Sequence, residues 1–157
     1  MAAPSITIVN DSDITVASWD CGTVQANSDS TILTILVWNN RGGSTALSDL
    51  KDVSITTLDI DGGSSSDVVA GKWVQANVPR VDGNNTTWTA IGGTTVKYLR
   101  ADALAAADGN VIRGIANDGT FTNAKSNYCT CRLKAHVPLN ATPGTKVWKT
   151  RINGYYV

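Results

Sequence analysis

The sequence predicts an all-β protein built as an antiparallel β-sandwich. Short apolar runs follow one another at a spacing of roughly 8 to 12 residues, with turn residues between them, which is typical of sandwiches and barrels. Residues 30–39 are apolar on both faces, as expected of a central strand covered from two sides. Residues 129–137 instead alternate between apolar and polar. Together the two patterns favour two facing sheets over a barrel.

Eight short strands are expected before the last part of the chain. Enrichment in Val, Ile, Thr and Trp between turn residues predicts each of them. They cover residues 5–9, 14–19, 30–39, 53–60, 72–78, 88–91, 95–99 and 111–115. The two runs 88–91 and 95–99 are predicted to form a hairpin about Gly92 and Gly93.

The chain closes with a strand, a corner and a strand. Alternate residues of the first strand form its buried face, and they are Cys129, Cys131, Leu133, Ala135 and Val137. The residues between them, from Tyr128 to His136, are expected to point the other way. Pro138 ends this strand, and Pro143-Gly144 predicts a tight reversal before a last strand that runs to Val157.

Residues 100–109 are the one helix candidate. They are rich in alanine, with Asp102 as a cap and Gly109 as a stop. At 157 residues the chain fits a single domain, 1–157, in which this helix belongs to an insertion around 100–127.

The net charge and the absence of targeting signals restrict the classes of partner that we expect. Lys and Arg together number 13, as do Asp and Glu, so the formal net charge is zero and nucleic acid is not an expected partner. A neutral surface gives little repulsion between copies, which favours self-association. The N-terminus carries no secretory signal and no stretch reaches membrane-spanning length, so we expect assembly in the cytoplasm and no membrane partner.

The three cysteines are expected to be buried thiols. Cys129 and Cys131 lie on one face of one strand, where a mutual bond has poor geometry, while a bridge from Cys21 to either of them stays open. The single histidine, His136, leaves too few ligands for zinc and is accompanied by no catalytic motif. We therefore expect neither enzyme activity nor a cofactor.

Two groups of residues are candidates for binding. Asp59 and Asp61, and separately Asp82, offer oxygen ligands of the kind calcium prefers, but such loops are usually plain turns, so no metal is expected. Of the five tryptophans, Trp38 is expected in the core. The aromatic candidates for interaction are Trp73, Trp88, Phe121, Tyr155 and Tyr156.

Residues 14–28, residues 31–43 and the corner at 137–145 together resemble bacterial and viral immunoglobulin-like domains, of the kind found in phage virion and surface-adhesion proteins. The resemblance implies an immunoglobulin-like sandwich and a non-enzymatic structural protein of the virion: a capsid decoration, tail or fibre component. Its partners would be further copies of itself and other virion proteins, docked symmetrically through loops 62–71 and 116–127.

Two other functions stay open. The chain is alternatively a carbohydrate- or surface-binding module in which Trp73, Trp88 and neighbouring residues hold a glycan. It is alternatively the subunit of an extracellular filament, in which residues 5–9 act as a strand donated to a neighbouring copy.

Overall fold

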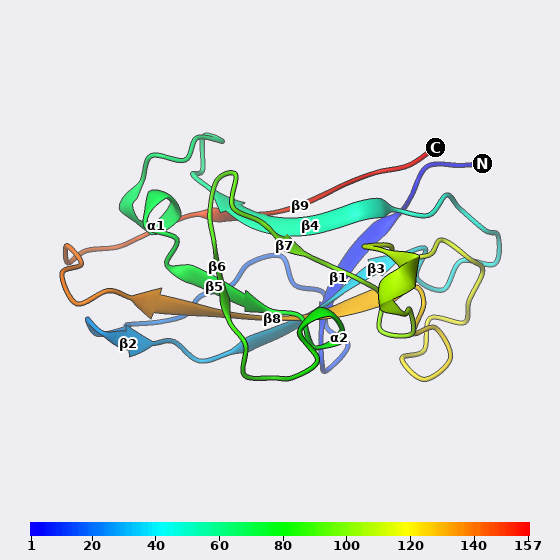
Figure 1. The fold of residues 1–157 in the computed structure, drawn as a ribbon, viewed down its shortest axis with the longest axis horizontal. Coiled ribbons are helices and arrows are strands. Elements are labelled where there is room, and N and C mark those ends of the chain that lie inside the picture. Colours follow the sequence, from blue (N-terminus) through cyan, green and yellow to red (C-terminus); the bar gives the residue numbers. More distant parts are fainter.

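Two antiparallel sheets face each other in the computed structural model, which describes residues 1–157 (Figure 1). The six-stranded sheet has the order β1-β3-β8-β5-β6, with β2 also paired to β8, and the three-stranded sheet has the order β7-β4-β9. The strands are β1 (Ile6–Asn10), β2 (Ser28–Asp29), β3 (Leu33–Asn39), β4 (Lys51–Leu58), β5 (Val74–Asn77), β6 (Thr89–Ile91), β7 (Lys97–Tyr98), β8 (Tyr128–Val137) and β9 (Lys149–Tyr155). The predicted all-β sandwich is confirmed.

The main core lies between the two sheets. Alternate residues of each central strand point into it, because successive side chains of a strand face opposite sides. The larger sheet contributes side chains such as Val37 and Cys131, and the smaller sheet contributes Val53 and Ile55. The predicted buried face of β8 is confirmed from Cys129 to Ala135, while Val137 at the end of the strand is half-buried.

The other face of the larger sheet is also covered at one end. There Trp38 and Leu36 of β3 pack with Val9 and Tyr128 in a second, smaller apolar cluster. This confirms that the central strand is buried from two sides. Tyr128 points away from the main core, as expected, but it is buried there against Trp38, with ring centroids 4.6 Å apart.

Two predicted strands are absent. Residues 14–19 only begin to return along β1, with Asn10 N–H donating to Ile14 O at 2.8 Å and Val16 N–H donating to Ile8 O at 3.0 Å. The chain then leaves the sheet, so residues 17–25 form no strand. Residues 111–115 contribute a single bridge between Ile112 and Leu50.

The predicted hairpin at 88–99 is confirmed only at its turn, where Gly92 and Thr95 exchange two backbone hydrogen bonds of 3.0 Å, and is wrong in the pairing of its strands. β6 pairs with β5 in the larger sheet and β7 pairs with β4 in the smaller one, so the chain crosses between the sheets at Gly92 and Gly93. Gly92 lies so close to the backbone of residue 69 in the same chain that a Cβ atom there would come within 2.2 Å of Val69 O. A residue with a side chain would therefore push the two segments apart.

The terminal strands likewise belong to different sheets. β8 is central in the larger sheet and β9 is an edge of the smaller one, and residues 138–148 connect them. The corner thus carries the chain from one layer to the other instead of reversing it within a layer. β9 ends at Tyr155, two residues before the last residue of the chain.

The predicted helix is also wrong. Residues 100–109 contain only a 3-10 turn, Ala106–Asp108. Asp102 does not cap a helix, because its carboxylate accepts hydrogen bonds from Thr130 on β8. The two short helices are α1 (Asp67–Ala70) and α2 (Pro79–Asp82). No helix combines the length and the apolar character that crossing a membrane requires.

Candidate functional site

A groove of about 800 Å³ opens at the end of the sandwich where the sheets are joined by residues 138–148. Its lining is mostly apolar and includes three of the five tryptophans, Trp19, Trp73 and Trp148. Trp19 and Trp148 meet edge to face, with ring centroids 5.8 Å apart and planes at 86°. They come from two connections that are distant in the sequence, so the groove exists only in the folded chain.

A cation lies over the aromatic wall of this groove. Lys146 Nζ is 5.7 Å from the ring centroid of Trp73 and 2.5 Å from the carboxylate of Asp67 at the start of α1. An apolar groove with a few polar groups at its rim is typical of a small-molecule site. Cys21 also lines the groove, but burial raises the pKa of its thiol, so it is not poised as a nucleophile.

A second cleft of about 420 Å³ lies on the other side of the Trp19–Trp148 pair. Apolar residues of the larger sheet, among them Ile35 and Leu133, face the residues that lead into β9. Val147 on this border is 63% exposed. The cleft therefore lies between the larger sheet and the segment that leads into β9.

β9 borders this cleft and has one open edge. It pairs with β4 on one side, and no backbone hydrogen bond joins its residues to any segment on the other side. The edge of β1 is covered by residues 14–16, and the edge strands β6 and β7 have three and two residues. At seven residues, β9 is thus the longest strand with an unpaired edge.

The predicted aromatic platform does not form. Trp73 faces the groove, whereas Trp88 lies on the outer face of the larger sheet beneath two cations of β8. Lys134 Nζ is 4.6 Å and Arg132 Cζ is 5.4 Å from the centroid of the Trp88 ring. A single glycan therefore cannot stack on both tryptophans, and the structure brings Trp73 together with Trp19 and Trp148 instead.

The other aromatic candidates divide into two groups. Phe121 packs on Trp38 and Tyr128, at centroid distances of 6.1 and 6.0 Å, so it belongs to the second apolar cluster. Tyr155 and Tyr156 are each 51% exposed at the end of β9. Of the predicted interaction residues, these two tyrosines are the most open to a partner.

The aspartates considered as calcium ligands, Asp59 and Asp61, instead accept hydrogen bonds from residues of their own loop. The Asp59 carboxylate accepts hydrogen bonds from the N–H groups of Ser65 and Ser66 and from the Ser66 hydroxyl, which lower its pKa. Asp61 accepts from Gly63 N–H at 2.8 Å. No group of three or more carboxylate, thiol or imidazole side chains gathers around a common point.

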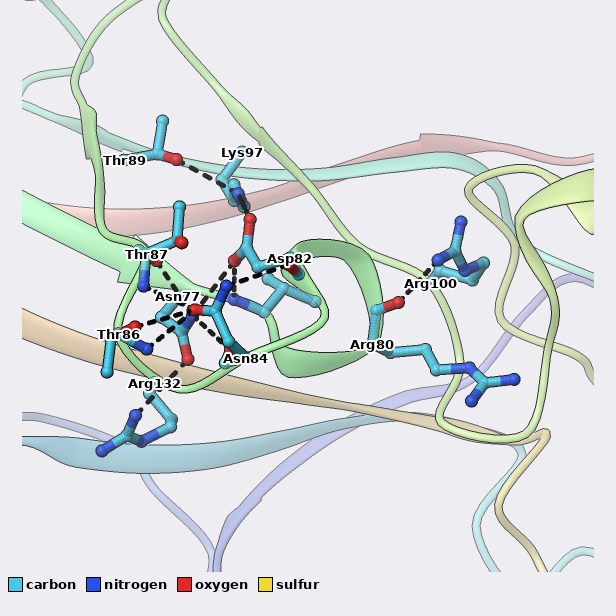
Figure 2. A network of polar contacts seen from close by, with 11 residues as sticks. Asn77, Arg80, Asp82, Asn84, Thr86, Thr87, Thr89, Lys97, Arg100 and Arg132 are labelled. Atoms are coloured by element: carbon cyan, nitrogen blue, oxygen red, sulfur yellow. Dashed lines mark hydrogen bonds and ion pairs between the residues drawn. The ribbon is translucent and has the colours of Figure 1, made fainter.

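Asp82 lies in a separate polar network, drawn in Figure 2. Its carboxylate pairs with Lys97 of β7, whose ammonium also donates to the Thr89 hydroxyl at 3.1 Å. The same carboxylate accepts from Asn77 Nδ2 and from Val78 N–H at the start of α2. The side chains of Lys97 and Asp82 are only 10% and 7% exposed, so the pair ties β7 to α2 rather than offering a metal site.

All three cysteines are free thiols, and no bridge joins Cys21 to β8. Cys129 and Cys131 are fully buried, and burial raises the pKa of Cys131 to about 12. His136 lies on the outer face of β8 with Nδ1 2.6 Å from the Asp29 carboxylate. That carboxylate also accepts from Lys134, and both bonds lower the pKa of Asp29.

Neither loop expected to dock partners is free along its whole length. Loop 62–71 contains α1, whose Val68 and Val69 are buried. Loop 116–127 ends in Asn127, which is fully buried and donates to the carbonyls of Asn39, Arg113 and Ile115. Removing residues 116–127 would therefore disturb the fold, so this loop does not serve docking alone.

Two features of the site are missing from the predictions. One is the pairing of Trp19 with Trp148, for which adjacent positions in the sequence give no signal. The other is the open edge of β9. A signal for the edge does exist, because Lys149, Thr150, Arg151 and Asn153 make both faces of that strand polar, as is typical of a strand at an edge.

Comparisons of the chain with protein-family models, with curated proteins and with solved structures give no match.

Proposed function

We propose that this chain is a non-enzymatic structural protein of a virus particle, a capsid decoration, tail or fibre component of a bacteriophage, that acts by symmetric docking of protein surfaces. The observation that carries most weight is the unpaired seven-residue edge of β9 above an apolar cleft. An edge with free N–H and C=O groups is a template for a further strand, and soluble monomers usually cover it, shorten it or place charged side chains on it. On β9, which is neither covered nor short, Lys149 and Arg151 are such charges.

Two further properties support the proposal. Zero net charge leaves little repulsion between copies, which suits a protein that packs in a lattice. The exposed Tyr155 and Tyr156 next to the open edge are of the residue type that interfaces favour.

The experiment is the mass and shape of the purified chain at micromolar concentration, by light scattering and negative-stain electron microscopy. Symmetric assemblies of two or more copies, from a dimer up to rings, spikes or filaments, are the expected result. A monomer of 16.5 kDa at every concentration would contradict self-assembly.

A second candidate, a carbohydrate-binding module, is favoured by one observation, the groove lined by Trp19, Trp73 and Trp148. Sugar rings stack on aromatic faces, and a bound sugar would change the emission of these tryptophans. Titration with a panel of soluble polysaccharides should then shift the fluorescence of the native chain but not that of Trp148→Ala. An unchanged native spectrum across the panel would argue against this function.

A further inference from the structure

The backbone groups along β9 divide into two sets. In an antiparallel sheet the N–H and C=O groups of one residue point to the same side, and successive residues alternate. On β4, the carbonyls of Val53 and Thr57 accept from Leu99 and Gly93, which lie on the β7 side. The alternate residues Ser54 and Thr56 therefore point toward β9.

The register then fixes which residues of β9 are free. Ser54 lies opposite Asn153 and Thr56 lies opposite Arg151, so Asn153 and Arg151 bond to β4. The residues between and beside them, Thr150, Ile152 and Gly154, direct their N–H and C=O groups to the open edge. None of the three has a backbone partner there.

The residue sequence of β9 is suited to pairing with itself in the antiparallel direction. A twofold axis at Ile152 would set Thr150 opposite Gly154 of the second copy, so all three free residues would fall in hydrogen-bonded pairs. On the outer face, Lys149 would lie opposite Tyr155 and Arg151 opposite Asn153. A cation facing an aromatic ring and a cation facing an amide are both favourable.

The parallel alternative places like charges together. In an in-register parallel pair, Lys149 would lie on Lys149 and Arg151 on Arg151 of the second copy, and like charges directly opposite are destabilising. The charges on the edge therefore select the antiparallel arrangement. The other edges of the sandwich compete poorly, because they are covered or have at most three residues.

We propose that β9 is a self-pairing edge, through which two copies of this chain join their three-stranded sheets into one continuous sheet about a twofold axis at Ile152. The inference rests on the proposed function, since it names the partner for self-association. It makes the interface isologous, so that each copy presents the same strand.

The first test is Thr150→Pro. The N–H of Thr150 faces the open edge, so proline there removes a bond to the second copy and none to β4. Thr150→Val is the matched control, because it keeps the N–H. Sedimentation analysis from 1 to about 500 μM should give a dimer for the native chain and for Thr150→Val, and a monomer with unchanged circular dichroism for Thr150→Pro.

The second test introduces a charge of either sign at one position of the outer face and does not depend on proline being tolerated. Asn153→Asp places a carboxylate opposite Arg151 of the second copy, and Asn153→Lys places a cation there. Each dimer contains this pair twice, so the aspartate should tighten the dissociation constant about two- to thirtyfold and the lysine should weaken it by about the same factor.

The outcomes separate the two proposals. A native chain that associates while Thr150→Pro and both Asn153 variants leave its dissociation constant unchanged overturns the pairing through β9 and leaves the proposed function standing. A native chain that is monomeric throughout overturns the pairing. Particles that assemble by electron microscopy from Thr150→Pro as readily as from the native chain would also place the contacts elsewhere.

Discussion

The carboxylate of Asp102 accepts two hydrogen bonds from Thr130, one from the backbone N–H at 2.8 Å and one from the hydroxyl at 2.6 Å. The contact holds the connection after β7 against the outer face of β8. Burial nevertheless outweighs these bonds and raises the pKa of Asp102 above its ordinary value. The folded chain therefore holds this proton more tightly than the unfolded chain does.

The sign of the resulting pH dependence follows from linkage. The contribution of Asp102 to the free energy of unfolding is fully present below the unfolded pKa of about 4 and is lost as pH rises through the raised folded pKa. Asp102→Asn should therefore gain stability relative to the native chain between pH 3 and pH 7, measured by urea unfolding. Asp118→Asn is the control with the opposite sign, because hydrogen bonds from Asn123 and Thr120 lower the pKa of Asp118. The same trend in both variants would contradict this account.

The buried ion pair between Lys97 and Asp82 should contribute more to the free energy of unfolding than the exposed ion pair between Lys146 and Asp67. Lys97→Met leaves the Asp82 carboxylate buried without its cation, which should cost about 3–5 kcal/mol. Lys146→Met removes the partner of Asp67, whose side chain is 43% exposed, and should cost less than about 1 kcal/mol. Urea unfolding at pH 7 compares the two, and equal losses would show that the burial of the first pair has no energetic consequence.

The thiols should react in two classes. Burial raises the pKa of all three thiols, but Cys21 is only half-buried at the groove, whereas Cys129 and Cys131 are fully buried in the core. A thiol with a pKa near 12 is ionised to about one part in ten thousand at pH 8, and the thiolate is the reactive form. An aromatic disulfide reagent at pH 8 should modify one thiol in the native chain and three after denaturation. Rapid modification of two native thiols would contradict the placement of β8.

Within the loop at 116–127, a substitution at residue 127 should destabilise the fold, whereas one at residue 123 should have little effect on stability. Asn127→Ala leaves the buried carbonyl of Asn39 and the half-buried carbonyl of Arg113 without this side-chain donor and should cost about 2–3 kcal/mol. Asn123→Ala in the same loop removes only an exposed contact with Asp118 and should cost less than about 1 kcal/mol. Thermal unfolding of the two variants distinguishes them, and equal midpoints would mean that residue 127 is not a fixed point of the fold.

The strands with strong apolar patterns were predictable, and their partners were not. β3 and β8 were recognisable because burial imposes a period on their own residues. β6 and β7 also lie where strands were expected, but each pairs with a strand of a different sheet. Pairing depends on which surfaces meet after the chain has crossed the sandwich, and Gly92 alone gives no sign of that crossing.

The errors at the site have a similar origin. Trp73 and Trp88 do not share a platform because residues next to two paired strands can face opposite sides of a sheet, and the sequence does not state which side each one faces. Trp148 lies in an irregular connection, where apolar and polar residues follow no regular pattern. The neighbouring residues therefore do not indicate that Trp148 meets Trp19. The polar composition of β9, by contrast, does carry the information that this strand is an edge.

The two chain ends lie at one end of the sandwich, away from the connection 138–148 (Figure 1). Ser48 joins them, since its N–H donates to Ala2 O at 2.9 Å and its hydroxyl contacts Val157 O at 3.4 Å. Because the ends are neighbours, the sandwich can be inserted whole into a surface loop of another protein with little displacement of the host chain. In such a chimera the tryptophan groove would point away from the host.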